Sequence, residues 1–127
     1  MLRDFGVALV LLDQSRMPAP KRLSQRFDPI TADWTYILWL GDRKGFERLT
    51  TTWDRTVIDG TNEIRSWVDV CYETVRRGGR VFGYANNHYG GHAPATIRQF
   101  RELWRGKGLP KIGKQFPEPL KERTLFD

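Results

Sequence analysis

The chain of 127 residues has the length of one domain, and its 39% hydrophobic residues, including five tryptophans, exclude an intrinsically disordered protein. Its single cysteine, Cys71, excludes an internal disulfide and a metal site built from a cysteine cluster, and we expect it on a buried helix face. The net charge of +6 favours anionic partners, although lysines and arginines are scattered as on an ordinary basic surface.

The first residues combine a helix end with a buried strand. Residues 1–5 are typical of the last turn of a helix, and Gly6 is a residue at which helices stop. The apolar run over residues 6–12 is typical of a strand buried on both faces of a parallel sheet. It is too short for a signal-peptide core, and no stretch approaches the about 20 apolar residues of a membrane span. We therefore expect a cytoplasmic protein.

A second strand and a long helix follow a loop rich in proline. Residues 14–33 predict this loop, with one helical turn around residues 22–26. Residues 34–40, rich in aromatic and β-branched side chains, predict the second strand, and residues 50–59 predict a polar connector. Residues 62–77 predict an amphipathic helix that ends before two glycines. The apolar stripe of this helix consists of Ile64, Trp67, Val68, Cys71 and Val75.

The last part of the chain predicts a strand, a polar loop, a helix and a tail. Residues 80–85 predict a third strand, and the connection before it is long enough for a right-handed crossover between parallel neighbours. The loop over residues 86–92 is dense in polar groups, and Pro94 predicts the start of a helix that reaches about residue 105. Residues 107–127, with three prolines and four lysines, predict an extended basic tail after a domain of residues 1–106.

Several stretches resemble the YecE-like family, domain of unknown function 72. Residues 86–94 (NNHYGGHAP), between a strand and a helix, resemble the C-terminal signature of that family. Residues 10–15 (VLLDQS), 31–34 (TADW) and 36–43 (YILWLGDR) resemble its preceding segments. Their order and spacing match over about residues 1–105, which is most of the chain.

The resemblance implies an α/β fold that is a partial TIM-type (β/α) barrel, the last three parallel strands with their flanking helices. A full barrel has eight strands and about 250 residues. Because a three-stranded piece leaves two open sheet edges, we expect a partner, either further copies of the chain or a missing N-terminal barrel half. Leu38 stands where members of the family usually carry an arginine, so this chain lacks that cationic group.

Polar side chains gather where the predicted strands end, which is the usual place of sites in α/β enzymes. His88 is the strongest acid–base candidate because imidazole titrates near neutral pH. Asp13 and Asp42, at the ends of the first two strands, complete the predicted catalytic set. The predicted ligand-binding residues are Asn86, Asn87, Tyr89, Gln14 and Arg43.

These candidates also have structural alternatives. Asn86 and Asn87 can cap the following helix, and Tyr89 can be a buried phenol. Asp13 and Asp42 can bond to local loops, and His92 is expected beside the start of the last helix. We do not predict a metal site, because the two histidines would need a third ligand from Asp13 or Asp42. The sequence identifies no cofactor.

Two functions are compatible with these features. In the first, the strand ends form a barrel mouth that binds an anionic ligand such as a nucleotide, nucleic acid or sugar phosphate, with acid–base, hydrolase-like chemistry. In the second, the chain is catalytically incomplete and acts by self-association or by nonspecific nucleic-acid binding through Lys107, Lys111, Lys114 and Lys121. The retained signature at residues 86–94 favours the first, and Leu38 favours the second.

Overall fold

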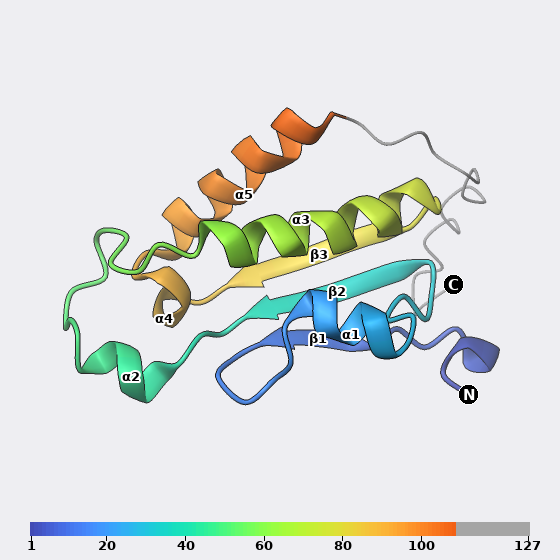
Figure 1. Ribbon diagram of the computed structural model, residues 1–127, viewed down its shortest axis with the longest axis horizontal. Coiled ribbons are helices and arrows are strands. Elements are labelled where there is room, and N and C mark those ends of the chain that lie inside the picture. The colour runs from blue at the N-terminus through green and yellow to red at the C-terminus, as the bar shows by residue number, and fades with distance from the viewer. Residues whose placement is uncertain (109–127) are drawn as a thin grey trace, which may run out of the picture.

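A computed structural model describes residues 1–108 and shows an α/β fold built on one parallel sheet (Figure 1). The strands lie in the order β1-β2-β3, and both neighbouring pairs are parallel. Three parallel strands with flanking helices confirm the expected α/β class and are consistent with a part of a (β/α) barrel. The elements in chain order are η1 (Arg3–Phe5), β1 (Val10–Asp13), α1 (Pro20–Arg26), β2 (Trp34–Trp39), α2 (Arg43–Glu47), α3 (Thr61–Arg76), β3 (Arg80–Ala85), α4 (Asn87–Gly90) and α5 (Ala93–Lys107).

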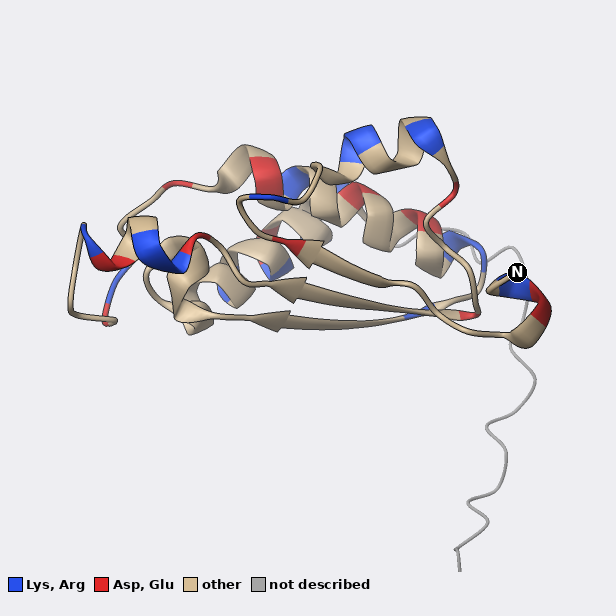
Figure 2. Ribbon diagram, turned by 90° about the horizontal axis from the view of Figure 1, so that it is seen from below, with Lys and Arg blue, Asp and Glu red and all other residues tan. Residues whose placement is uncertain are grey.

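The longer helices all lie on one face of the sheet (Figures 1 and 2). Helices α1, α3 and α5 cover this face, while the short helices α2 and α4 lie beyond the ends toward which the strands point. Within residues 1–108, no helix covers the opposite face (Figure 2). The sheet therefore separates a packed side from an open side.

The core lies between the sheet and α3, and the sequence pattern explains why. Side chains of a strand alternate between the two faces, so Thr35, Ile37 and Trp39 of β2 all point to the helices, where each is at most 2% exposed. Trp67 and Cys71 of α3 pack against them. Four members of the predicted apolar stripe of α3 are buried and Val75 is half-buried. Burial raises the pKa of the Cys71 thiol to about 12, as expected for a structural cysteine.

The open side corrects one expectation about the strands. The apolar run at the start of the chain predicted a strand buried on both faces, but Val10 of β1 is 46% exposed. Phe82 and Tyr84 of β3 are 44% and 52% exposed on the same side. The prediction was wrong because hydrophobic content reports only what a strand can bury, and here nothing in the described chain covers this face.

The boundaries of the elements differ from the prediction in three places. β1 is shorter than expected, because the Thr31 hydroxyl replaces a neighbouring strand, accepting from the Leu9 N–H at 2.8 Å and donating to the Val7 carbonyl at 2.8 Å. Helices α2 and α4 lie where only a turn and a loop were predicted. Helix α5 extends to Lys107, and the rest of the predicted basic tail lies outside the described residues.

An ion-pair cluster fixes the end of α3 at the side where the strands begin. Arg76 and Arg77 both donate to the carboxylate of Glu73, and Arg77 also donates to Asp28 at 2.6 Å. The hydrogen bond from Arg76, followed by that from Arg77, lowers the pKa of Glu73 to about 2. The cluster thus joins the last turn of α3 to the loop after α1.

Acid is expected to weaken this cluster in a defined pH window. The folded-state pKa of Glu73 lies below its ordinary value of 4.5. The ionised carboxylate therefore makes its full contribution to the free energy of unfolding above pH 4.5, and this contribution is lost as the pH falls towards about 2. Since the side chain is partly exposed, solvent screening limits this contribution to about 1 kcal/mol. Urea unfolding across this window should show a flatter pH dependence for Glu73→Gln than for the wild type. The exposed Glu102→Gln should behave as the wild type, and equal slopes for all three proteins would contradict the prediction.

Candidate functional site

The backbone brings the three predicted strand ends together at one edge of the sheet. The carbonyl of Asp13 accepts from the N–H groups of Leu40 and Gly41, both at 2.9 Å. The Asn86 N–H donates to the Trp39 carbonyl at 2.8 Å. These bonds extend the ladder of the sheet beyond its last paired residues. The strand ends therefore lie side by side, as the parallel order requires.

Two asparagines define the turn between β3 and α5. Asn86 caps α4, since its side-chain oxygen accepts from the His88 N–H at 3.0 Å. The side-chain oxygen of Asn87 accepts from the Ala93 N–H at 2.8 Å, in the first turn of α5. His92 occupies the N-cap position of α5. Both asparagines therefore make the helix-capping contacts that were the structural alternative to ligand binding. These two caps position the segment that carries His88.

His88 is held between two acceptor groups and an aromatic ring. Its Nδ1 lies 2.7 Å from the side-chain oxygen of Asn86, a distance suited to an Nδ1–H that donates to this oxygen. Its Nε2 lies 3.3 Å from Oε1 of Glu47, and Trp53 contacts the imidazole edge to face with centroids 4.6 Å apart. Only 19% of the His88 side chain is exposed. The ring is thus fixed in one orientation, with Nε2 directed toward a carboxylate.

Glu47, like Trp53, belongs to this site although the sequence did not reveal it. In α2 it follows Arg43 by four residues, and the Arg43 Nε donates to Glu47 Oε1 at 2.9 Å. The hydrogen bond from Arg43, followed by that from His88, lowers the pKa of Glu47. A single carboxylate oxygen therefore bridges a guanidinium and an imidazole. We call Arg43, Glu47, Trp53, Asn86 and His88 the strand-end cluster.

The loop before α3 and two glycines fix the strand-end cluster in place. Trp53 stacks on the buried Phe46 with centroids 5.6 Å apart, and the Val57 N–H donates to the Gly90 carbonyl at 2.7 Å. Gly91 has a φ of 113°, and a Cβ there would lie 2.4 Å from the Arg55 carbonyl oxygen. The connector over residues 50–59 is thus pinned against α4, and a larger side chain at Gly91 would separate the two.

Asp13 faces a different side from the strand-end cluster. It pairs in register with Trp39, and its carboxylate accepts from Trp67 Nε1 at 2.5 Å and from the Tyr89 hydroxyl at 3.0 Å. Burial and then the neighbouring Asp13 charge raise the pKa of Tyr89 above its ordinary value. No described contact joins Asp13 to His88. Asp13 therefore connects β1, α3 and α4 through partners distant in the sequence, whereas the structural alternative had been bonding to a local loop.

A family model described as "Protein of unknown function DUF72" matches residues 1–120 of the chain. The chain belongs to the DUF72 family. This confirms the resemblance carried by residues 86–94 and the segments upstream. No curated protein and no solved structure matches the chain at comparable significance.

The other predicted residues of this DUF72 chain lie around the strand-end cluster without joining it. Asp42 is exposed at the N-cap of α2, where its backbone carbonyl accepts from the Phe46 N–H. Gln14 is half-buried after β1, and its carbonyl accepts from the Met17 N–H. Within residues 1–108 there is no group of three or more side chains suited to bind a metal ion. In the same part of the chain, no helix is both long and apolar enough to cross a membrane.

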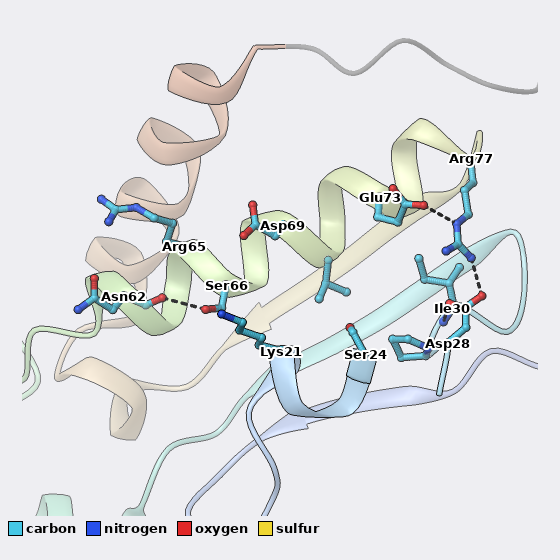
Figure 3. A pocket seen from close by; sticks show the side chains of 12 residues that line it. Lys21, Ser24, Asp28, Ile30, Asn62, Arg65, Ser66, Asp69, Glu73 and Arg77 are labelled. Atoms are coloured by element: carbon cyan, nitrogen blue, oxygen red, sulfur yellow. Dashed lines mark hydrogen bonds and ion pairs between the residues drawn. The ribbon is translucent and has the colours of Figure 1, made fainter. Parts of the chain in front are cut away.

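A cavity of about 580 Å³ lies on the helix-covered side, away from the strand ends (Figure 3). Lys21 and Ser24 line it from α1, while Asn62, Ser66 and Asp69 line it from α3. At one end, its charged groups are satisfied within the cluster of Arg77, Asp28 and Glu73. The short helix α1 explains this groove, since its seven residues cover only part of the 16-residue α3.

Proposed function

We propose that the strand-end cluster of this DUF72 chain binds an anionic, phosphate-bearing ligand and that His88 performs acid–base chemistry on it. The observation that carries the proposal is the position of Glu47 Oε1, between Arg43 Nε at 2.9 Å and His88 Nε2 at 3.3 Å. The carboxylate occupies a place where two cationic groups converge when His88 is protonated. An oxygen of a phosphate ester has the charge and hydrogen-bonding capacity to replace it.

Exchange of Glu47 for a ligand is energetically accessible. The Glu47 side chain is 46% exposed and Arg43 is 76% exposed, and solvent screens ion pairs of such exposure so that they contribute little net stability. Glu47 can therefore move into solvent when a ligand with more negative charge arrives. The net charge of +6 favours the approach of such ligands.

His88 has the orientation that a general acid or base requires. Asn86 fixes the proton on Nδ1, which leaves Nε2 to take a proton from water or to give one to a leaving oxygen. Before a ligand binds, Glu47 stabilises the protonated ring, since its carboxylate is in contact with Nε2, and the bound phosphate takes over that role. Asp13 acts at a distance, because it positions Tyr89 next to His88 in α4. The proposed reaction class is hydrolysis of a phosphate ester.

Inorganic phosphate provides a direct test of the proposed site. The chain has only two histidines, so the imidazole proton signals in NMR spectra are simple to assign with His92→Gln. In a phosphate titration below the ordinary histidine pKa of about 6.5, we expect the His88 signal to shift and saturate. Glu47→Gln should bind phosphate about fivefold more tightly, because the competing carboxylate is gone. Arg43→Gln should weaken binding.

Glu102→Gln is the matched control, since it changes the net charge equally at an exposed position of α5. It should leave the phosphate affinity close to that of the wild type. If the His88 signal ignores phosphate in both the wild type and Glu47→Gln, the proposed site is wrong.

The second candidate function, association without catalysis, is favoured by the uncovered apolar face of the sheet. Val10, Phe82 and Tyr84 are exposed there although they are large and apolar. Such a face is expected for the C-terminal part of a barrel that joins another polypeptide. Of the four lysines proposed to contact nucleic acid, only Lys107 lies in the described part of the chain, where it pairs with Asp69. An oligonucleotide affinity that falls steeply with salt would support this nucleic-acid contact, and no affinity would oppose it.

A further inference from the structure

An apolar cavity of about 340 Å³ lies between the helix-covered face of the sheet, α3 and α5, and we call it the side pocket. It shares no lining residue with the strand-end cluster or with the cavity of Figure 3. Its walls are apolar side chains that remain half-buried, namely Val75, Val81, Ile97, Phe100 and Trp104. The side pocket is therefore a separate feature of the fold, with apolar surface that nothing in the described chain covers fully.

A glycine in β3 and the inclination of α5 explain why this space is open. Gly83 pairs in register with Ile37, so it faces the helices but contributes no side chain there. The Trp39 ring lies over it, since a Cβ at Gly83 would be 3.0 Å from two carbons of that ring. Helix α5 runs at an angle to α3 and β3 (Figure 1). Phe100 of α5 packs on Trp39 with centroids 5.3 Å apart, and the side pocket lies beside this contact.

The polar side chains that line the side pocket are hydrogen-bond donors, apart from the buried thiol of Cys71. Trp39 is only 2% exposed, and within residues 1–108 its Nε1 has no hydrogen-bond partner. The Trp104 indole makes ring contacts but no hydrogen bond in this part of the chain. Arg101 is exposed at the rim, and no acceptor among the described residues contacts its guanidinium. A ligand that completes this set must therefore supply acceptors, and none of the described lining residues is a carboxylate.

We propose that the side pocket binds a small carboxylic acid with an apolar body, of the size of a medium-chain fatty acid. At about 30 Å³ for a group of the size of a water molecule, 340 Å³ holds about ten such groups. The apolar body removes the half-buried walls from water, and the carboxylate accepts from Arg101 in a charge-assisted hydrogen bond.

The charge of the site selects a carboxylate over other amphiphiles. Arg101 is the one cationic side chain among the described lining residues, so it balances a single negative charge. A phosphate monoester carries more charge and would leave part of it against apolar walls, which is unfavourable. A neutral apolar molecule would leave the guanidinium without an acceptor. The inference is independent of phosphate binding at the strand-end cluster.

Titration with octanoate, which has about the size of the side pocket, tests the proposal. The chain has five tryptophans, whose indole N–H signals are resolved by NMR, and Trp104→Phe and Trp34→Phe assign two of them. We expect the Trp104 signal to shift and saturate. The signals of Trp34, on the uncovered face of the sheet, and of the His88 imidazole should stay in place.

Two arginines of α5 provide a matched pair of variants. Arg101→Gln should weaken octanoate binding about threefold to fivefold, as expected for the loss of an exposed ion pair. Arg98→Gln makes the same change of charge at an exposed position that does not line the side pocket, and it should keep the wild-type affinity. Octanamide, the neutral amide of the same chain length, should bind the wild type and Arg101→Gln with equal, weaker affinity.

A Trp104 signal that ignores octanoate in the wild type would overturn the proposal. Equal affinities of Arg101→Gln and Arg98→Gln would also overturn it, because the carboxylate would then not be recognised at the rim. A shift of Trp34 in place of Trp104 would put the ligand on the uncovered face of the sheet instead. Octanoate binding at Trp104 together with a His88 signal that ignores phosphate would support the side pocket and count only against the proposed function.

Discussion

Gly41→Ala is expected to lower the free energy of unfolding by about 3 kcal/mol and to displace α4 from the strand ends. Gly41 has a φ of 71°, a left-handed conformation that costs a residue with a Cβ about 1–2 kcal/mol. A Cβ at Gly41 would also lie 2.1 Å from the carbonyl oxygen of His88. Because the obstacle is backbone and not a flexible side chain, the whole of α4 must move. The strand-end cluster would lose the contact between Glu47 and His88.

Urea unfolding and the His88 imidazole signal together measure this effect. Gly106→Ala is the control, because a Cβ at Gly106 meets nothing within 4 Å and lies in the helical part of α5. It should leave stability unchanged or raise it by up to about 1 kcal/mol, as expected for glycine to alanine in a helix. If Gly41→Ala unfolds like the wild type and retains its His88 signal, the close approach of α4 to Gly41 is not as described.

The sequence was sufficient for the elements whose periodicity spans many residues. β2, β3 and α3 lie within one residue of their predicted bounds, because alternation or a helical stripe is repeated along each of them. The short helices α2 and α4 have five and four residues, which is too few for a periodic signal. The adjacent glycines Gly90 and Gly91 were also part of the reason to expect a loop and not a helix over residues 86–92. In fact the cap from Asn86 starts α4, and Gly91, with positive φ, ends it.

The residues of the candidate site were predictable in unequal measure. His88 and Asn86 stand in a dense polar loop after a strand, and the structure joins them directly. Glu47 lies 41 residues before His88, in an ordinary stretch of charged residues, and only the contact of α2 with the α4 segment reveals it. Asp13 was chosen because it ends a strand. A position at the end of a strand does not show toward which face of the sheet the side chain points. The Asp13 carboxylate points to the helix-covered face, where it accepts from Trp67.

Loss of the Asp13 carboxylate is the second change that we expect to lower the free energy of unfolding strongly. It accepts from Trp67, which is fully buried, and from Tyr89, whose hydroxyl lies 3.0 Å away. Asp13→Ala would leave both donors without their acceptor, at about 1–3 kcal/mol for each unsatisfied group. We expect a loss of about 2–4 kcal/mol in the free energy of unfolding. Asp13→Asn keeps an acceptor oxygen at the same position and should lose only about 1 kcal/mol.

A double-mutant cycle with Trp67→Phe separates the hydrogen bond from the packing of the indole. Phenylalanine has no N–H to satisfy, so removal of Asp13 should cost less in the Trp67→Phe background than in the wild type. Unfolding in urea gives the four free energies that the cycle requires. Additive losses would mean that Asp13 and Trp67 act independently, and the carboxylate would then not be what joins α3 to the end of β1. Coupling would instead confirm Asp13 as a structural centre of the fold, which joins the end of β1 to α3 and α4.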